Sequence, residues 1–359
     1  MIAKMRQKSM SMKSRYSQGT LLPPIIIIVF LVFIILPWVA RILQPSSATF
    51  INSLFFDVFT YCALGAAWNI IGGFGRQSSW AHSSFLAIGA YASFILYSNF
   101  NISPLIGILV SMVLAMILAI VIGLPTFRLS GVYFTLGTIA TCAIVRQVLL
   151  AWEAVTNGAG GLILSYTKVN DILNLRFTSN IYYYYIMLFV MMISFGVMIA
   201  INRGKLGYYL KAISQNQIAA QSLGIDSIKI KITAFIISAM LTAMVGVIFA
   251  FKTQYLEPDA VATIDLSTKI VLVSIIGGIG TEWGPLLGGV VLIPMLQILN
   301  TFFGQVFNGA LAQTSYGAIL VLLVIFLPNG LLSIKEVIKS RVKRRRKIDT
   351  PIKDKSQIS

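Results

Sequence analysis

Residues that could carry covalent or metal chemistry are few in this chain of 359 residues. His82 is the only histidine, and the two cysteines, Cys62 and Cys142, lie inside apolar runs. One histidine and two distant thiols provide no metal-ligand spacing, so we interpret both cysteines as packing residues and expect no metal and no cofactor. The apolar runs contain no Ser-His-Asp or paired-carboxylate arrangement, and the sequence has no phosphate-binding G-x-x-x-x-G-K-S/T loop. We therefore predict a protein without catalytic residues, which is not an enzyme and leaves any ATP hydrolysis to other chains.

Two glycine-rich segments interrupt apolar runs in matching places. Residues 72–80 read GGFGRQSSW and residues 277–283 read GGIGTEW. Interrupted helices in matching halves often border a transporter's pathway, because their freed backbone groups need water or a ligand. The alternative is that these glycines only permit close helix packing. The residues that we consider as pathway candidates are Gln77, Ser79, His82, Gly277, Gly278, Gly280 and Trp283.

His82 has two interpretations of its own. It can lie at a turn near the inner mouth of a pathway and contact the solute. The alternative, which we favour, is a histidine at a helix start that is hydrogen-bonded to neighbouring carbonyl groups.

A long loop rich in basic residues, residues 203–231, can form an amphipathic helix. On one continuous helix, intervals of three and four residues align Leu206, Leu210, Ile213, Gln217, Ala220 and Gly224. The second half of this stripe contains small residues, which let another backbone approach closely. Such a helix at the inner membrane surface suits docking into a groove of a partner protein. The alternative is a helix that lies in the lipid headgroup layer.

The elements that hold these residues are predicted to be transmembrane helices. Hydrophobic residues make up 57% of the chain and charged residues only 11%, and the apolar runs approach the length that crosses a bilayer. We predict an all-α polytopic bundle of about ten spans, and consider nine or eleven as alternatives because the eighth span is short. The predicted spans are 25–43, 50–71, 83–100, 104–124, 132–151, 182–201, 230–251, 266–278, 285–303 and 315–332.

The charged residues predict which loops face the cytoplasm. With the N-terminus inside, most of the 28 basic residues fall in inner segments, whereas acidic residues concentrate outside. Both termini are therefore predicted to be cytoplasmic, with a basic N-terminus (residues 1–24), a transmembrane domain (25–334) and a basic tail (335–359). We attribute the net charge of +17 to this topology and to anionic membrane lipid rather than to nucleic acid.

Five short motifs are distributed over nearly the whole chain after the first predicted span. The first contains Gln77, Ser79, His82, Ser83, Ser84, Phe85, Gly89, Ala90 and Tyr91. The second and third contain Arg128, Gly131, Val132, Tyr133 and Phe134, and Thr156, Gly158 and Gly161. The last two contain Gly277, Gly278, Gly280, Trp283, Gly284, Pro285 and Gly288, and Leu327, Pro328, Gly330 and Leu331. In these motifs the chain resembles the permeases of branched-chain amino-acid ABC importers, specifically the M-type Liv permeases.

The resemblance implies a coupling helix in residues 203–229, which docks on an ATPase subunit and transmits its closure to the spans. The residues expected to form this contact are Leu210, Ile213, Gln217, Ile218, Ala219, Ala220, Leu223, Gly224 and Ile225. The family usually has acidic residues just before the Ala-Ala pair, whereas this chain has Gln215, Asn216 and Gln217. This difference leaves open which ATPase binds.

The resemblance also implies partners and a location. These are two cytoplasmic ABC ATPase subunits, a second related permease and an extracytoplasmic substrate-binding protein, in the inner or plasma membrane of a prokaryotic cell. The solute would be a branched-chain amino acid. Alternatives are a permease of the same family for urea, short amides or other amino acids, and a stand-alone sodium-coupled carrier or channel. A structural membrane scaffold would explain the spans but not the Ala-Ala-x-x-x-Gly-Ile loop.

Overall fold

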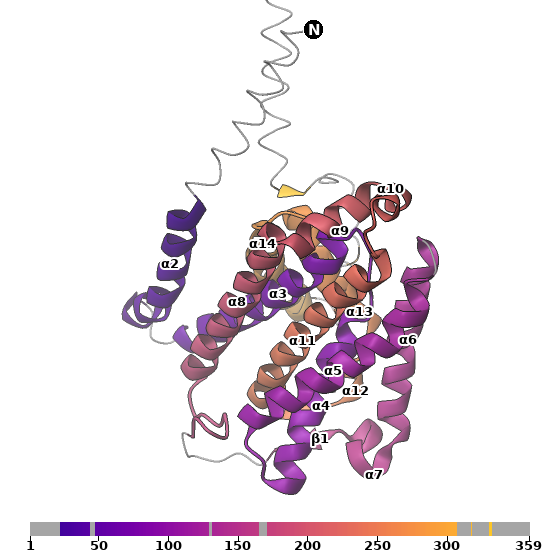
Figure 1. The fold of residues 1–359 in the computed structure, drawn as a ribbon. Coiled ribbons are helices and arrows are strands. Elements are labelled where there is room, and N and C mark those ends of the chain that lie inside the picture. The colour runs from indigo at the N-terminus through magenta and orange to yellow at the C-terminus, as the bar shows by residue number, and fades with distance from the viewer. Residues whose placement is uncertain are drawn as a thin grey trace, which may run out of the picture. The chain divides into compact units, whose positions relative to one another are not determined.

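The computed structural model describes residues 22–43, 47–128, 131–164, 171–306, 317 and 330–331. In these parts the chain is helical apart from short strands and loops, which confirms the predicted all-α fold (Figure 1). The chain divides into two compact units, unit 1 (residues 1–53) and unit 2 (54–359), with the boundary inside one helix. Most of the predicted N-terminal segment and of the tenth span, and the whole basic tail, lie outside the described residues.

Unit 1 contains helix α2, Leu22–Leu43, and the start of helix α3, Ala48–Trp68. Helix α2 begins before the predicted start of the first span at residue 25. Pro23 and Pro24 fit its first turn, because the N–H groups there have no partner within the helix. Trp38 and Ile42 are well exposed, as expected for a helix that faces lipid.

Six helical segments of the described chain are long and apolar enough to cross a membrane. They are Ala48–Phe74, Pro104–Thr126, Val132–Ala151, Asn180–Arg203, Ser227–Thr253 and Pro258–Gly278. Shorter apolar stretches are Phe30–Val39 and Gly284–Leu299. The predicted number of ten spans is therefore not confirmed, whereas the polytopic character of the chain is.

Unit 2 holds the remaining elements. In chain order they are η1 (Asn69–Phe74, a π-helix), α4 (His82–Phe100), α5 (Pro104–Thr126), α6 (Val132–Ala151), α7 (Glu153–Thr156), η2 (Gly158–Gly160), β1 (Leu162–Ile163), α8 (Asn180–Arg203), α9 (Lys205–Gln215), α10 (Gln217–Ser222), α11 (Ser227–Thr253), β2 (Tyr255–Leu256), α12 (Pro258–Val261), α13 (Ile264–Gly278) and α14 (Gly284–Val306). Strands β1 and β2 pair antiparallel, with Leu162 opposite Leu256. The short eighth span is extended at its start, because Thr263 caps α13 by accepting a hydrogen bond from the Leu266 N–H (3.3 Å).

The core of unit 2 is formed by helices α4, α5 and α11, which pack closely on one another. Small residues make this possible: a Cβ atom at Gly89 would collide with the Ala243 carbonyl, and one at Gly246 with the Leu86 carbonyl. Ser111 of α5 donates a hydrogen bond to the Gly89 carbonyl (3.0 Å). Such close approaches with interhelical hydrogen bonds are typical of helices in membranes, where lipid gives no hydrophobic drive for association.

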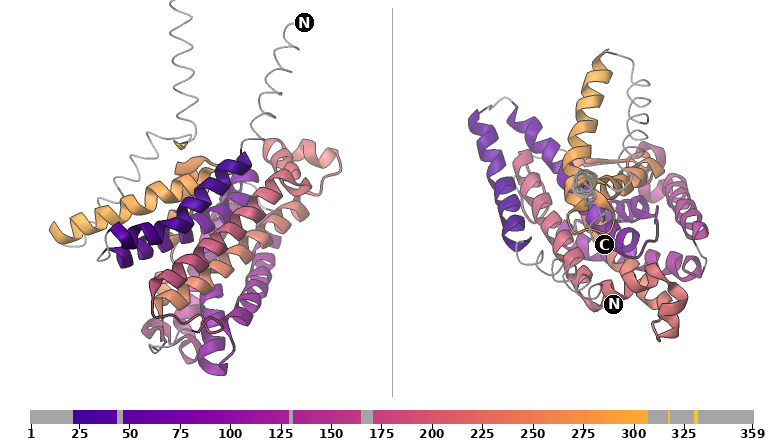
Figure 2. Two further views of the ribbon diagram at one scale, coloured as in Figure 1. Left: turned by 90° about the vertical axis from the view of Figure 1, so that its left-hand side faces the viewer. Right: turned by 90° about the horizontal axis from the view of Figure 1, so that it is seen from above.

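The connecting segments gather at two ends of unit 2. Helices α9 and α10 lie at one end, and α7 and β1 at the opposite end (Figure 1). Helix α8 runs alongside α11 between these ends (Figure 2). The loop 203–231 and the connection after α6 thus lie at opposite ends of unit 2, as the predicted topology requires. Which end faces the cytoplasm stays a prediction.

Candidate functional site: a cavity beside two glycine-rich segments

The two glycine-rich segments meet in the structure through one buried side chain. Asn69, the first residue of η1, donates a hydrogen bond from Nδ2 to the Thr281 carbonyl (2.9 Å), and its Oδ1 accepts one from the Gly280 N–H (2.9 Å). A Cβ atom at Gly73 would lie only 2.8 Å from the Gly280 nitrogen. Gly280 has a φ of 70°, a conformation that L side chains rarely adopt. The segments that resemble each other in sequence are therefore in direct backbone contact.

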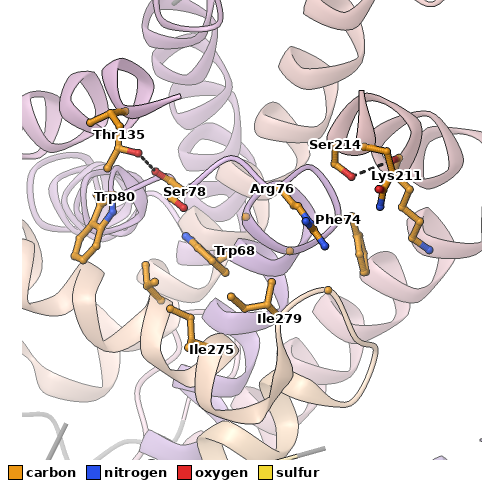
Figure 3. Close-up of a pocket in the computed structure, with 16 residues that line it drawn as sticks. Trp68, Phe74, Arg76, Ser78, Trp80, Thr135, Lys211, Ser214, Ile275 and Ile279 are labelled. Carbon is orange, nitrogen blue, oxygen red and sulfur yellow. Dashed lines mark hydrogen bonds between the residues drawn. The ribbon is translucent and has the colours of Figure 1, made fainter. Parts of the chain in front are cut away.

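A cavity of about 900 Å³ lies beside this contact (Figure 3). Its walls come from η1 and the loop after it, the start of α6, helix α9, and the end of α13. Hydrogen bonds that hold the loop include one from Trp68 Nε1 to the Ser79 carbonyl (2.8 Å) and one from Thr135 Oγ1 to the Ser78 carbonyl (3.2 Å). The glycine-rich segment is thus hydrogen-bonded to both α3 and α6, and forms one wall of the cavity.

The cavity combines positive charge with apolar surface. Its charged lining residues are Arg76 and Lys211, whereas Ile275 and Ile279 of the facing segment are apolar. Arg76 has a φ of 49°, which is uncommon for a non-glycine residue and marks a constrained position. Lys211 Nζ lies 5.3 Å from the ring centroid of Phe74. Desolvation lowers the pKa of Lys211, and the negative charge of Glu282 opposes this shift.

Of the predicted pathway residues, Gly280 lines this cavity, and the other six are not among its lining residues in the described chain. The side chain of Ser79 is fully buried. A Cβ atom at Gly277 would collide with the Gly284 carbonyl, so this glycine permits close packing of α13 on α14. The packing interpretation thus describes Gly277, while Gly280 belongs to the cavity wall. Their part in transport stays a prediction.

His82 is the first residue of α4 and is completely buried. Its Nε2 lies 2.8 Å from the Ser238 hydroxyl of α11, and that hydroxyl donates to the Ala67 carbonyl (2.6 Å). Because the Ser238 proton is used in this way, His82 Nε2 must be the donor. The prediction that His82 lies at a helix start is confirmed. The prediction that it is hydrogen-bonded to neighbouring carbonyl groups is wrong, because its partner is a hydroxyl group on another helix.

Polar contacts among buried small side chains anchor the start of α4, and sequence reasoning missed them. Ser267 Oγ of α13 lies 2.6 Å from the Trp80 carbonyl and 2.8 Å from Ser83 Oγ. Ser83 Oγ is 3.0 Å from the Cys142 thiol of α6. Both cysteines are buried and free, as predicted. The sequence does show serines within apolar runs. Lipid tails offer a serine hydroxyl no hydrogen-bond partner, so such serines often form hydrogen bonds to other helices.

The loop 203–231 does not form one continuous helix. Helix α9 ends at Gln215, and α10 begins at Gln217 after Asn216, whose φ of −156° is extended and whose Oδ1 accepts a hydrogen bond from the Ala219 N–H (3.0 Å). The prediction that one helical stripe runs through residues 206–224 is therefore wrong. An asparagine at this place favours a new helix start, because its side chain competes for backbone groups within a helix and caps a new one.

The predicted contact residues of this loop fall into two groups. Leu210, Ile213 and Ala220 are buried against the rest of unit 2. Ile218 and Leu223, in contrast, are 77% and 83% exposed. Large apolar side chains are thus exposed on α10 and on the turn after it. The remaining predicted contact residues are exposed or partly exposed; they are Gln217, Ala219, Gly224 and Ile225.

Curated relatives of the chain are membrane permeases. The high-affinity branched-chain amino acid transport system permease protein LivM of Escherichia coli (strain K12) is 25% identical over 298 residues, which are 76% of this chain and 67% of that protein. The corresponding permease protein BraD of Pseudomonas aeruginosa is 30% identical over 161 residues, 44% of this chain and 50% of that protein. The ribose import permease protein RbsC of Haemophilus influenzae is 28% identical over 136 residues, 37% of this chain and 41% of that protein.

The family match covers most of the chain. Residues 50–327 match the family described as "Branched-chain amino acid transport system / permease component". No solved structure matches the chain significantly. With its membrane-crossing helices and a match that extends over both glycine-rich segments, the chain belongs to the family of permease components of branched-chain amino acid transport systems.

Proposed function

We propose that this chain is the membrane-spanning permease subunit of an ATP-binding-cassette importer and forms the pathway for a branched-chain or related amino acid. Separate ATPase subunits drive it, and the chain itself does no covalent chemistry. The observation that carries this proposal is the position of α9. This helix lines the cavity with Lys211, Ser214 and Gln215, and leads directly into the exposed residues of α10.

The chemistry of the cavity supports an amino acid as solute. A zwitterion with a branched side chain presents a carboxylate and a small apolar group. Arg76 can bind the carboxylate by a charge-assisted hydrogen bond, while Ile275 and Ile279 provide the apolar surface. Urea and short amides carry no carboxylate, so Arg76 would contribute less to their passage.

The exposed residues of α10 and the turn after it form the docking surface for an ATPase in this proposal. Ile218 and Leu223 would insert into an apolar groove of that subunit, in the manner of an amphipathic helix. A second, related permease would complete the pathway, and an extracytoplasmic binding protein would deliver the solute at the opposite end. We place the assembly in the inner membrane of a prokaryotic cell.

The proposal is tested by isolating the chain from its native membrane with the chains that accompany it and reconstituting the assembly in liposomes. We expect an ATPase subunit among the accompanying chains, and uptake of L-leucine that depends on ATP. Uptake by the chain alone, without any ATPase, would instead establish a stand-alone carrier or channel.

The solute class is tested with the same liposomes. Arg76→Gln should raise the concentration of L-leucine for half-maximal uptake about tenfold or more, since a charge-assisted hydrogen bond contributes about 1.5–3 kcal/mol. Arg128→Gln, which changes an exposed arginine outside the cavity, is the matched control. Uptake of urea rather than L-leucine by the unmodified assembly would favour the alternative permease of the same family.

A further inference from the structure

Glu282 belongs to the second glycine-rich segment and is bound by the end of α8, directly before helices α9 and α10, which together we call the coupling segment. It follows Gly280 and Thr281, and its side chain is only 14% exposed. Its carboxylate accepts hydrogen bonds from Asn202 Nδ2 (2.6 Å) and from Arg203 Nε and Nη2 (3.3 and 3.1 Å). The negative charge in the glycine-rich segment is thus bound by the last residues of α8, immediately before α9 begins.

Asn202 extends this cluster to α9. Its Oδ1 accepts a hydrogen bond from Lys211 Nζ, while its Nδ2 donates to Glu282. Lys211 is a lining residue of the cavity, and its ammonium lies over the Phe74 ring of η1. Movement of α9 would therefore pull on Glu282 through one intervening amide group.

The two residues that precede Glu282 are hydrogen-bonded to the first residue of η1. The Thr281 carbonyl and the Gly280 N–H both bind the side chain of Asn69. Asn69 opens the π-helix, an uncommon element that occurs mostly as single turns and frequently at functional sites. Hydrogen bonds, together with one short stretch of backbone, thus connect α9 to η1 without a gap.

We propose that Glu282 is the positioning residue that links the coupling segment to the wall of the cavity. When α9 moves, the Asn202–Arg203–Glu282 cluster carries the displacement to residues 280–281, and Asn69 passes it to η1. The role attributed to α9 rests on the proposed function, but the mechanical link itself concerns this chain alone. The two can therefore be tested separately.

The link is tested first by hydrogen exchange of the purified full-length chain in lipid nanodiscs. Glu282→Gln removes the ion pair with Arg203 and keeps the size of the side chain. Exchange of the Gly280 amide and of Asn69–Phe74 should then rise about twofold to thirtyfold, the range that corresponds to the coupling energies of mutations within such a network. Glu153→Gln, at an exposed carboxylate of α7 at the opposite end, should leave that exchange unchanged.

Arg203→Gln provides an independent variant, because it breaks the same cluster from a side chain that is 51% exposed and should not disturb folding. It should raise exchange in Asn69–Phe74 as Glu282→Gln does, and the double variant should add little to either change. An effect confined to residues adjoining each substitution, or additive effects of the two, would overturn the proposal.

The second measurement uses the assembled transporter and counts L-leucine molecules taken up per ATP hydrolysed. Glu282→Gln should lower this ratio about fivefold to tenfold while ATPase subunits still bind. If exchange spreads to η1 but no ATPase binds even the unmodified chain, the proposed function fails and the link stands. If ATPases bind and drive uptake but Glu282→Gln changes neither exchange nor the ratio, the link fails and the proposed function stands.

Discussion

The Gly280 N–H donates a hydrogen bond to the side-chain oxygen of Asn69, 211 positions earlier in the chain. The same side chain donates to the Thr281 carbonyl, so one buried amide group satisfies two backbone groups at a break between helices. Backbone freed at a helix break must find such partners when it is buried away from water. This pair therefore lets two interrupted helices coexist inside the bundle.

Replacing Asn69 by alanine should destabilise unit 2. The Gly280 N–H and the Thr281 carbonyl would lose their partner, at a cost of about 1–3 kcal/mol for each buried group. We expect a clearly lower midpoint of thermal unfolding in detergent. Gln147→Ala, at an exposed amide of α6, is the control and should leave the midpoint near that of the unmodified chain. Equal midpoints for the two variants would show that the Asn69 contacts contribute little.

Alanine at two glycines should have opposite effects on stability. At Gly277 the added methyl group would collide with the Gly284 backbone, and overpacking of this kind costs about 1–3 kcal/mol. At Gly196, within α8, the methyl group meets no neighbour and should stabilise the helix by about 0.5–1 kcal/mol. The fraction of folded protein that remains after heating measures both. Similar losses at both positions would contradict the close packing of α13 on α14.

His82→Gln should leave uptake largely intact, because His82 is buried against Ser238 and is not among the residues that line the cavity. The glutamine amide retains a donor for the Ser238 hydroxyl. His82→Leu lacks this donor and should lower the thermal midpoint more. Uptake of L-leucine and unfolding in detergent are measured on the same preparations. A large fall in uptake with an unchanged midpoint in His82→Gln would assign this histidine to the pathway.

The docking surface is tested by Leu223→Ser and Gly224→Leu. Both should abolish co-purification of the ATPase and uptake, because Leu223 is exposed and Gly224 has a φ of 83°, at which a leucine is strained. Ala220→Arg should have the same effect, although Ala220 is buried and its variant needs a check of insertion.

Ile163→Ser is the control for these variants, because Ile163 is equally well exposed but belongs to β1 at the opposite end. It should keep ATPase binding, which is the property compared with the variants of the docking surface. Normal ATPase assembly in Leu223→Ser and Gly224→Leu would contradict the assignment of the coupling segment.

Much of the fold could be predicted from the positions and lengths of the apolar runs. The runs from Pro104 and Val132 correspond closely to α5 and α6, because helices that face lipid are apolar along their whole length. Helix α4 is less apolar than the six membrane-crossing segments, and much of it is packed between other helices. Hydropathy alone therefore does not determine the number of spans.

The site could be predicted only in part. The pattern of glycines marked both segments that meet beside the cavity, because a glycine-rich break has a recognisable composition. Asn69 and Glu282 could not be chosen in this way, since their partners are 212 and 80 positions away and no local pattern indicates them. Asparagine is a residue type that often begins a new helix, but the apolar stripe predicted a helix that continues through Asn216.

The burial of Cys62 and Cys142 has a practical consequence for spectroscopy. Thiol-reactive probes label exposed sulfhydryls, and neither native thiol is accessible in the folded chain. A cysteine introduced at Leu223 or Ile163 would therefore be the sole reactive site of its kind. Fluorophores or spin labels can be attached one at a time to either end of the bundle without first replacing the native residues.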